Sequence, residues 1–238
     1  MKNTTRILTW NLGLFPWCHW GDSLRVSING NPVRHEFFQK ANGNFIAEKI
    51  REINPDICVL EEFKKESDRL YFIDLIRDVY NFRVFVDAWY GRSTILILSK
   101  KEIVVSKLGS SEFYQVKTHD LSIVPVHLNS FYPWFRLRQV KELIKDIRDG
   151  GGIDVILGDT NIWSVTKLHL PVFWYDKMST KLLEKNFAQV TRAFGSTTKY
   201  GLNLDKIFVN KKLSFTNPKV VRENAKYMDH YPVYVDLS

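Results

Sequence analysis

Polar side chains that are costly to bury follow several apolar, strand-like runs of the sequence, and their types suit metal-assisted hydrolysis. A carboxylate at the end of a buried strand needs a partner, and a divalent cation is a good one. If these strand ends converge, they supply oxygen ligands and a histidine, which favours Mg²⁺ or Mn²⁺ beside a catalytic base. The polar residues, in chain order, are Asn11, Glu61-Glu62, His127, Asp159-Thr160-Asn161 and Asp229-His230.

Short runs rich in Val, Ile, Leu and Phe alternate with turn residues along the whole chain, which predicts many strands. Helical periodicity predicts three helices among them, at 43–53, 68–78 and 136–148. This order favours two sheets packed face to face with helices on their outer faces, in one domain spanning 1–238. The predicted strands are 5–11, 56–61, 82–88, 94–99, 102–108, 121–128, 153–158, 204–209 and 231–236.

The order of the motifs resembles that of the endonuclease/exonuclease/phosphatase superfamily, the DNase I-like phosphoesterases. The matching segments run in the family's order and span nearly the whole chain. Each is weak alone, and together they are specific. They are T-W-N at 9–11, P-D-I-C-V-L-E-E at 55–62, H-L-N-S at 127–130, R-L-R-Q at 136–139, G-D-T-N at 158–161, L-D-K-I-F-V at 204–209 and D-H-Y-P-V at 229–233.

The resemblance implies a four-layered α/β sandwich, with two packed, mostly antiparallel sheets flanked by helices. It also implies hydrolysis of a phosphate ester that depends on a divalent metal, Mg²⁺ or Mn²⁺. By the same resemblance Glu62 is the principal metal ligand. Asn11 and Asp229 complete or support the metal site.

The family's catalytic residues map onto five further positions. Asp159 and Asn161 would lie across the phosphate and orient the attacking water, and His127 would stabilise charge there or protonate the leaving group. His230 would be the general base or a phosphate contact, with Asp205 holding its other ring nitrogen. Either His230 or Asp159 would activate the water. Without the resemblance, Asp205 could instead pair with a neighbouring lysine such as Lys206.

Three positions depart from the family's usual pattern and bear on the substrate. Glu61 replaces a common Gln, so this extra carboxylate either binds metal or hydrogen-bonds the neighbouring backbone. Thr160 replaces a Phe and gives a form similar to that of 5′-tyrosyl-DNA phosphodiesterases, and Met228 replaces a Ser. The R-L-R-Q segment is either a family element or the solvated first turn of a helix.

Composition excludes several classes of protein. With 45% hydrophobic residues among 238, the chain can form a core and is not disordered. Two cysteines exclude a disulfide scaffold, and Cys58 lies in an apolar run typical of a core. No stretch is long and apolar enough to span a membrane, and no apolar segment precedes the first strand, which predicts a cytoplasmic protein. The net charge of +8 favours a polyanionic partner: nucleic acid, phosphorylated small molecules or an anionic membrane surface.

Aromatic residues crowd the segments that follow the predicted strands, as in 15–20 after Asn11, 89–90 after strand 82–88, 131–135 after His127 and at Trp163 after Asn161. If the strand ends converge, these rings line the rim of the site. They could stack on bases, seat an acyl chain or enter a membrane interface, or simply pack as small satellite cores. Segment 13–35, with a predicted hairpin turn at Asn29-Gly30-Asn31, suggests a specificity element over the site.

The sequence therefore predicts a metal-dependent phosphodiesterase acting on nucleic acid, with DNA favoured. The alternative is the same chemistry on a phospholipid, a sphingolipid or an inositol phosphate. A third hypothesis is an inactive nucleic-acid-binding protein on this fold. No obligate protein partner is predicted.

Overall fold

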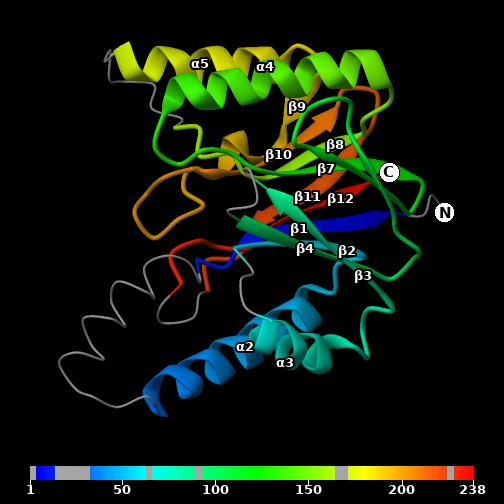
Figure 1. The fold of residues 1–238 in the computed structure, drawn as a ribbon, viewed down its shortest axis with the longest axis vertical. Coiled ribbons are helices and arrows are strands. Elements are labelled where there is room, and N and C mark those ends of the chain that lie inside the picture. Colours follow the sequence, from blue (N-terminus) through cyan, green and yellow to red (C-terminus); the bar gives the residue numbers. More distant parts are fainter. Residues whose placement is uncertain (1–3, 14–32, 63–65, 89–92, 164–170, 224–227) are drawn as a thin grey trace.

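Two six-stranded sheets form the centre of the molecule, and helices cover the outer face of each. The computed structural model describes residues 4–13, 33–62, 66–88, 93–163, 171–223 and 228–238. Figure 1 shows α2 and α3 below one sheet and α4 and α5 above the other, so the layers run helix, sheet, sheet, helix. The predicted four-layered α/β sandwich is confirmed.

The first sheet has the strand order β11-β12-β1-β2-β4-β3. Its neighbours are antiparallel except for the central pair β1 and β2, which is parallel. The two helices on its outer face are α2 (Val33–Ile53) and α3 (Glu66–Ile76). The strands are β1 (Thr5–Asn11), β2 (Ile57–Glu61), β3 (Phe82–Ala88), β4 (Ser93–Ser99), β11 (Phe215–Val220) and β12 (Val233–Leu237).

The second sheet repeats this plan with the order β5-β6-β7-β8-β10-β9. Again one central pair, β7 and β8, is parallel and the others are antiparallel. Its outer helices are α4 (Pro133–Gly150) and α5 (Pro171–Glu184), and the 3₁₀-helix η1 (Val190–Phe194) follows β9. The strands are β5 (Val104–Lys107), β6 (Tyr114–Thr118), β7 (Leu121–His127), β8 (Val155–Asp159), β9 (Phe187–Gln189) and β10 (Asp205–Asn210).

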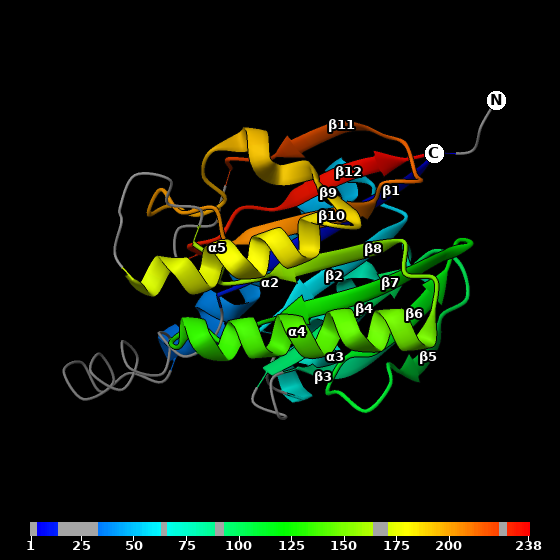
Figure 2. The same ribbon diagram turned by 90° about the horizontal axis from the view of Figure 1, so that it is seen from above.

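The two parallel pairs place the motif residues. Parallel neighbours need a crossover connection, which α2 supplies between β1 and β2 and α4 supplies between β7 and β8. All four strands therefore end at the same edge of their sheets. Figure 2 shows β7 and β8 running side by side, visible between α4 and α5.

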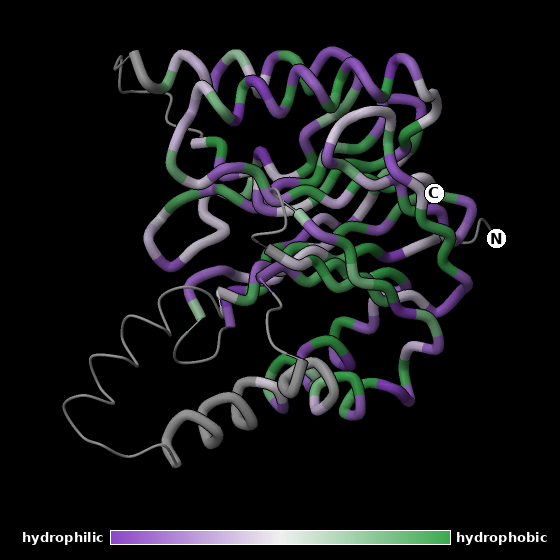
Figure 3. Tube along the Cα trace, viewed as in Figure 1, coloured by the Kyte–Doolittle hydropathy of each residue, from purple (hydrophilic) through white to green (hydrophobic). Residues whose placement is uncertain are grey.

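Alternation along the strands divides the interior into three apolar clusters. One face of each sheet contributes to the cluster between the sheets, which includes Ile7, Val59 and Leu157. The opposite faces pack against α2 and α3 on one side and against α4 and α5 on the other. Figure 3 shows the resulting green, hydrophobic segments within the sheets. Cys58 is buried, as predicted.

The sequence missed β6, β9, β11 and α5 for physical reasons. β6 (Tyr114–Thr118) and β11 (Phe215–Val220) carry alternating or mostly exposed polar residues, because each lies near a sheet edge. β9 is three residues long, and α5 begins in an aromatic-rich stretch without a clear helical stripe. The helix predicted at 43–53 begins ten residues earlier, at Val33.

The predicted hairpin around Asn29-Gly30-Asn31 falls mostly outside the described residues, which resume at Val33. The strand predicted to follow this turn, at 32–34, was wrong where it can be checked, because Val33 and Arg34 begin α2. None of the helices in the described parts of the chain is long and apolar enough to cross a membrane.

Candidate functional site

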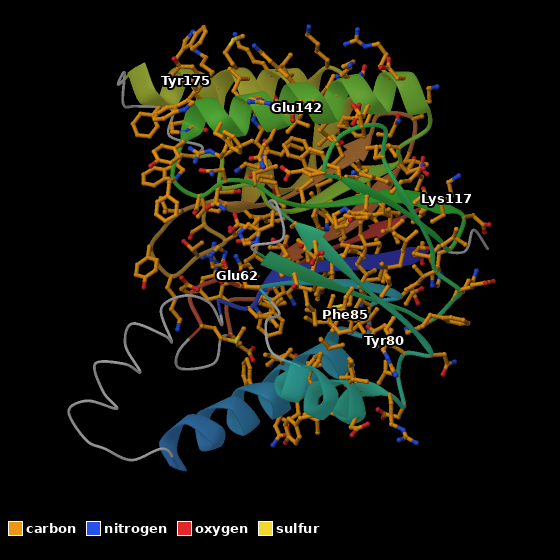
Figure 4. The ribbon with its side chains drawn as sticks, in the orientation of Figure 1. Glu62, Tyr80, Phe85, Lys117, Glu142 and Tyr175 are labelled. Carbon is orange, nitrogen blue, oxygen red and sulfur yellow. The ribbon has the colours of Figure 1, made fainter. Side chains whose placement is uncertain are left out.

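The strand register brings the motif residues from both sheets to one place. In the first sheet Asn11 pairs with Glu61, and in the second Asp159 pairs with both His127 and Asp205. Asn11 has the same strand parity as Ile7, and Asp159 has the same parity as Leu157, so both face the space between the sheets. The polar cluster therefore caps one end of the inner core. Figure 4 shows Glu62 at this end and Lys117 at the opposite end.

A buried pair of His230 and Asp205 lies at the centre of the site. His230 Nδ1 lies 2.8 Å from Asp205 Oδ2 and 3.1 Å from Oδ1, and the Asp205 side chain is fully buried. The Trp10 indole donates to the His230 carbonyl at 3.2 Å and anchors this loop. Burial alone would lower the pKa of His230, but the Asp205 carboxylate raises it well above its usual value. Burial raises the pKa of Asp205.

Alternation along β10 explains why Asp205 does not pair with Lys206. Consecutive side chains point to opposite faces of the sheet, so Lys206 faces the helix side. Its ammonium donates to the backbone carbonyl of Asn203, and burial lowers its pKa to about 8. The alternative pairing of Asp205 with Lys206 was therefore wrong.

Asp159 connects this pair to the first sheet. Its Oδ2 accepts a hydrogen bond from Asn11 Nδ2 at 2.9 Å, and its Oδ1 accepts one from the backbone N–H of Asn161 at 2.8 Å. Asp159, Asp205 and His230 each offer a ligand atom within 4.8 Å of the others, and all three are buried. This group could hold a metal ion.

Glu62 lies next to this group with one unpaired oxygen. Its Oε1 accepts from Asn11 Nδ2 at 3.2 Å, and His127 Nε2 lies 3.7 Å from the same oxygen. Its Oε2 is buried without a hydrogen-bond partner in the described part of the chain, and burial raises the pKa of Glu62. A buried carboxylate oxygen without a donor is where a divalent cation fits.

Of the other two predicted ligands, Asn11 contacts Glu62, and Gly13 connects Asn11 to Asp229. The Asn11 amide donates to Glu62 and Asp159, while its oxygen accepts from the Gly13 N–H at 2.9 Å. Gly13 has φ +58°, and a Cβ there would lie 2.3 Å from Asp229 Oδ1. Glycine is thus required for the half-buried Asp229 to approach. Ligation by Asn11 and Asp229 stays a prediction.

Asn161 and His127 complete the predicted set. Asn161 has φ +50°, and its side-chain amide donates to the Leu128 carbonyl at 3.1 Å. His127 is 8% exposed, and its Nδ1 lies 4.0 Å from Glu61 Oε2 while its Nε2 faces Glu62. The structure brings all eight predicted residues to one end of the sandwich.

Glu61 has a structural role that the sequence left between two alternatives. It is fully buried and accepts from the Thr9 hydroxyl at 2.8 Å and from the Asp159 N–H at 2.6 Å. The second alternative, a hydrogen bond to neighbouring backbone, is what the structure contains. Burial and the nearby aspartates raise the pKa of Glu61 well above its usual value.

The residue before Asp159 is a glycine for steric reasons. At Gly158, with φ +139°, a Cβ would lie 1.9 Å from the Val126 carbonyl oxygen.

Arg136 is a buried positioning residue of the loop after His127. Its guanidinium makes two bonds to Asp176, at 2.9 and 2.8 Å, and donates to the Asn129 and Ser130 carbonyls. The interpretation of this segment as a solvated helical turn was therefore wrong for Arg136, while Arg138 is exposed. The sequence missed Asp176 because α5 itself was not predicted.

Several aromatic side chains in the segments after His127 and Asn161 are exposed, and their position at the rim of the site stays a prediction. Phe131, Tyr132, Trp134, Trp163 and Trp174 are exposed. Those predicted at the rim in 15–20 and 89–90 lie outside the described residues.

Solved structures with the same fold have different activities. An AP endonuclease from Archaeoglobus fulgidus superposes with a TM-score of 0.69 at 18% identity, covering 97% of this chain and 98% of that one. Sphingomyelinase C from Streptomyces griseocarneus superposes with a TM-score of 0.62 at 16% identity, covering 99% of each chain. A mutant beta toxin from Staphylococcus aureus with bound magnesium ions superposes with a TM-score of 0.60 at 16% identity, covering 98% of this chain and 99% of that one.

At these identities the superpositions show the fold alone. No curated protein sequence matches the chain. The sequence model of the Endonuclease/Exonuclease/phosphatase family matches residues 8–229, from β1 to the residue before His230. That span includes seven of the eight predicted site residues and most of the chain, and the protein belongs to the endonuclease/exonuclease/phosphatase family.

Proposed function

We propose that this protein is a divalent-metal-dependent phosphodiesterase whose substrate is nucleic acid, with DNA favoured. The observation that carries the proposal is the continuous buried array from Asp205 and His230 through Asp159 and Asn11 to Glu62. Cleavage of an anionic phosphodiester needs charge neutralisation, a deprotonated nucleophile and help for the leaving oxygen. This array supplies groups for all three.

Glu62, Asn11 and Asp229 would hold the metal, and the unpaired Glu62 Oε2 supports this assignment. Oxygen donors of this kind suit Mg²⁺ or Mn²⁺. When bound, the metal supplies charge neutralisation at the phosphate and lowers the pKa of a coordinated water. The magnesium ions bound in the structurally similar beta toxin favour Mg²⁺.

The remaining residues would position and move protons. Asp205 accepts a hydrogen bond from Nδ1 of His230, which fixes the orientation of the ring and leaves Nε2 to exchange a proton or contact the substrate. Asn161, whose side chain and backbone are both fixed by hydrogen bonds, would orient a phosphoryl oxygen, and His127 would face the leaving group. His230 and Asp159 are the two candidates for the base. Rescue of the His230→Ala variant by added imidazole would assign proton transfer to His230, and failure of that rescue would favour Asp159.

A second candidate keeps the chemistry on a phospholipid, a sphingolipid or an inositol phosphate. The exposed aromatic rings at the site end, such as Phe131 and Trp134, also suit an acyl chain or a membrane interface. The structural similarity to a sphingomyelinase C favours keeping this candidate in the test.

The test is hydrolysis of single- and double-stranded DNA, RNA, sphingomyelin and inositol phosphate with Mg²⁺. We expect cleavage of DNA by the wild type, and a rate about 10²–10⁴-fold lower for the His230→Ala and Glu62→Ala variants. The matched control is Glu102→Gln, which changes an exposed carboxylate and should leave the rate unchanged.

Three results would contradict the proposal. Undiminished cleavage by His230→Ala and Glu62→Ala would overturn the mechanism. Turnover of only the lipid or inositol substrates would overturn the nucleic-acid assignment and support the second candidate. Nucleic-acid binding without metal-dependent turnover of any substrate would show an inactive binding protein.

A further inference from the structure

The outer face of α4 carries a stripe of exposed cationic residues that begins with a tryptophan. Trp134, Arg138, Lys141, Lys145 and Arg148 follow one another at spacings of four, three, four and three residues, and all are exposed. Because an α-helix has 3.6 residues per turn, these spacings place the five side chains along one line. The line extends about 21 Å from the tryptophan to the last arginine.

Helix α5 repeats the arrangement. Trp174, Lys177 and Lys181 are exposed and lie three and four residues apart. Figure 2 shows α4 and α5 on the same outer face, and the buried Arg136–Asp176 pair joins them near their amino-terminal ends. We call the exposed residues of these two stripes the α4–α5 basic face.

The positive charge is concentrated on this face and does not simply reflect the net charge of the whole chain. Among the described side chains of α4 and α5, Glu142 pairs with Arg138 at 2.8 Å and the exposed Asp149 lies at the far end from the tryptophans, so Lys141, Lys145 and Arg148 carry the excess positive charge of the α4 stripe. On the opposite side of the molecule, the described side chains of α2 and α3 expose Glu48, Glu52 and Asp74 against Arg51. A polyanion would therefore be attracted to the α4–α5 side.

Two connections join the candidate active site to the tryptophan ends of this face. The one after His127 exposes Phe131 and Tyr132 and leads into α4, where the Tyr132 and Trp134 rings lie 4.9 Å apart. The one after Asn161 exposes Trp163, whose backbone N–H donates to Asp176 of α5 at 3.2 Å.

A third connection, next to His230 in the fold, also carries an exposed ring. Thr198 forms an isolated bridge with His230, and the turn from Thr198 to Gly201 carries Tyr200, which is 76% exposed. Exposed rings thus occur on three connections that border the site. Two of these connections, those after His127 and Asn161, lead into the two cationic stripes.

We propose that the α4–α5 basic face binds a single strand of nucleic acid that extends beyond the cleavage site, with bases stacked on the rings and phosphates along the cations. The proposal deepens the proposed function and rests on it. The cations of α4, from Arg138 to Arg148, extend over about 15 Å, the length of a few nucleotides of a strand. Base–aromatic stacking together with a cationic groove or line is how proteins hold single strands without sequence preference.

A strand fits this face better than a bilayer does. Each exposed large hydrophobic residue of the described part of this end is aromatic, and the one exposed aliphatic residue of that size, Val104, lies on β5. A face that enters a bilayer typically presents aliphatic side chains as well. Cations arranged in narrow lines leading away from the rings also match a linear polyanion.

The test measures binding of a fluorescent 12-nucleotide single strand at several salt concentrations, in the His230→Ala background so that cleavage does not interfere. One variant carries Lys141→Gln, Lys145→Gln, Lys177→Gln and Lys181→Gln together. We expect its slope of log affinity against log salt to be shallower by about 0.7 for each phosphate that the substituted lysines had neutralised. Trp134→Ala and Trp174→Ala should each weaken binding by about fivefold or more.

The matched control changes the same number of exposed lysines elsewhere: Lys101→Gln, Lys107→Gln, Lys117→Gln and Lys212→Gln. Its salt slope should equal that of the parent. With His230 restored, both sets should hydrolyse a small chromogenic phosphodiester at the wild-type rate, because that substrate does not reach the helices.

The outcomes separate this inference from the proposed function. Equal salt slopes for the two lysine variants would overturn the inference while leaving nucleic-acid cleavage by the wild type intact. Lysine-dependent binding to phosphatidylserine vesicles without oligonucleotide binding would overturn it in favour of a membrane. Failure of the wild type to cleave any nucleic acid would overturn the proposed function, whatever the variants bind.

Discussion

Glu61 shows how a single buried acid fixes the geometry of its neighbours. Each of its oxygens accepts one hydrogen bond, from the Thr9 hydroxyl and from the Asp159 backbone N–H. The residue thereby ties β1 and β2 of one sheet to β8 of the other, directly beneath the proposed reactive groups. Its burial raises its pKa well above the usual value, so the protein bears a cost for ionising it.

We expect the Glu61→Gln variant to be more stable than the wild type by about 1 kcal/mol, because a neutral amide can make both hydrogen bonds. Its oxygen can accept from Asp159, and its NH₂ can donate to the Thr9 hydroxyl. Urea unfolding with chelator present measures the difference. Glu61→Ala is the comparison and should lose about 1–3 kcal/mol, because it leaves the Asp159 N–H unsatisfied.

If Glu61 instead bound metal, Glu61→Gln would lose magnesium affinity. A calorimetric titration that found such a loss would contradict the hydrogen-bonding role.

At the scale of elements, α4 and α5 are held together by a charged pair inside the protein. Arg136 and Asp176 are 3% and 1% exposed at their side chains. Because Arg136 also donates to the carbonyls of Asn129 and Ser130, the pair sets the path of the loop that leaves His127. The helices therefore position the site as well as covering the sheet.

Removing one partner leaves the other charge buried, so Arg136→Ala should lose about 3–5 kcal/mol of stability. The exposed pair of Arg138 and Glu142, on the same helix, is the control, and Arg138→Ala should lose less than about 1 kcal/mol. Chemical denaturation of both variants gives the comparison. An equal loss of stability in the two variants would show that burial does not increase the contribution of the Arg136–Asp176 pair to stability.

The strands and their ends could be predicted largely from sequence, since apolar runs of the right length are local signals. Glu62, Asp159 and His230 were identified because they follow or precede such runs. The partners that fix them were not, because Asp176 and Thr9 become neighbours of the site only through tertiary packing. The cationic stripes of α4 and α5 were also missed, since a solvated helix face looks ordinary until its neighbour is placed.

At the scale of the whole molecule, the first and last described strands are neighbours in one sheet. β1 pairs antiparallel with β12, with Arg6 opposite Asp236, and these side chains form a two-point ion pair with distances of 2.6 and 3.0 Å. The hydrogen bond from Arg6 lowers the pKa of Asp236 and raises that of Arg6.

Because the pKa of Asp236 is lower in the folded state than in the unfolded state, the pair stabilises the fold above the unfolded value of 3.8. That stability is lost as the pH falls through the folded value. We expect Asp236→Asn to cost about 1 kcal/mol at pH 7, a modest figure because Arg6 is partly exposed. The difference from wild type should shrink below about pH 4.

Urea unfolding at pH 7, 5 and 3 would follow this difference. Asp74→Asn, on the exposed face of α3, is the control. A constant penalty for Asp236→Asn at all three values would show that the ion pair is not its source.

The pairing of β1 with β12 also bears on how the protein is made. During synthesis on the ribosome, β1 and β2 emerge early, but the other neighbour of β1 is present only after Val233–Leu237 have left the exit tunnel. Asn11 and His230, held close by the bond from Trp10 to the His230 carbonyl, come from the same two ends. The site therefore cannot form until the chain through Leu237 has left the exit tunnel, so we expect a shorter nascent chain to lack the assembled site.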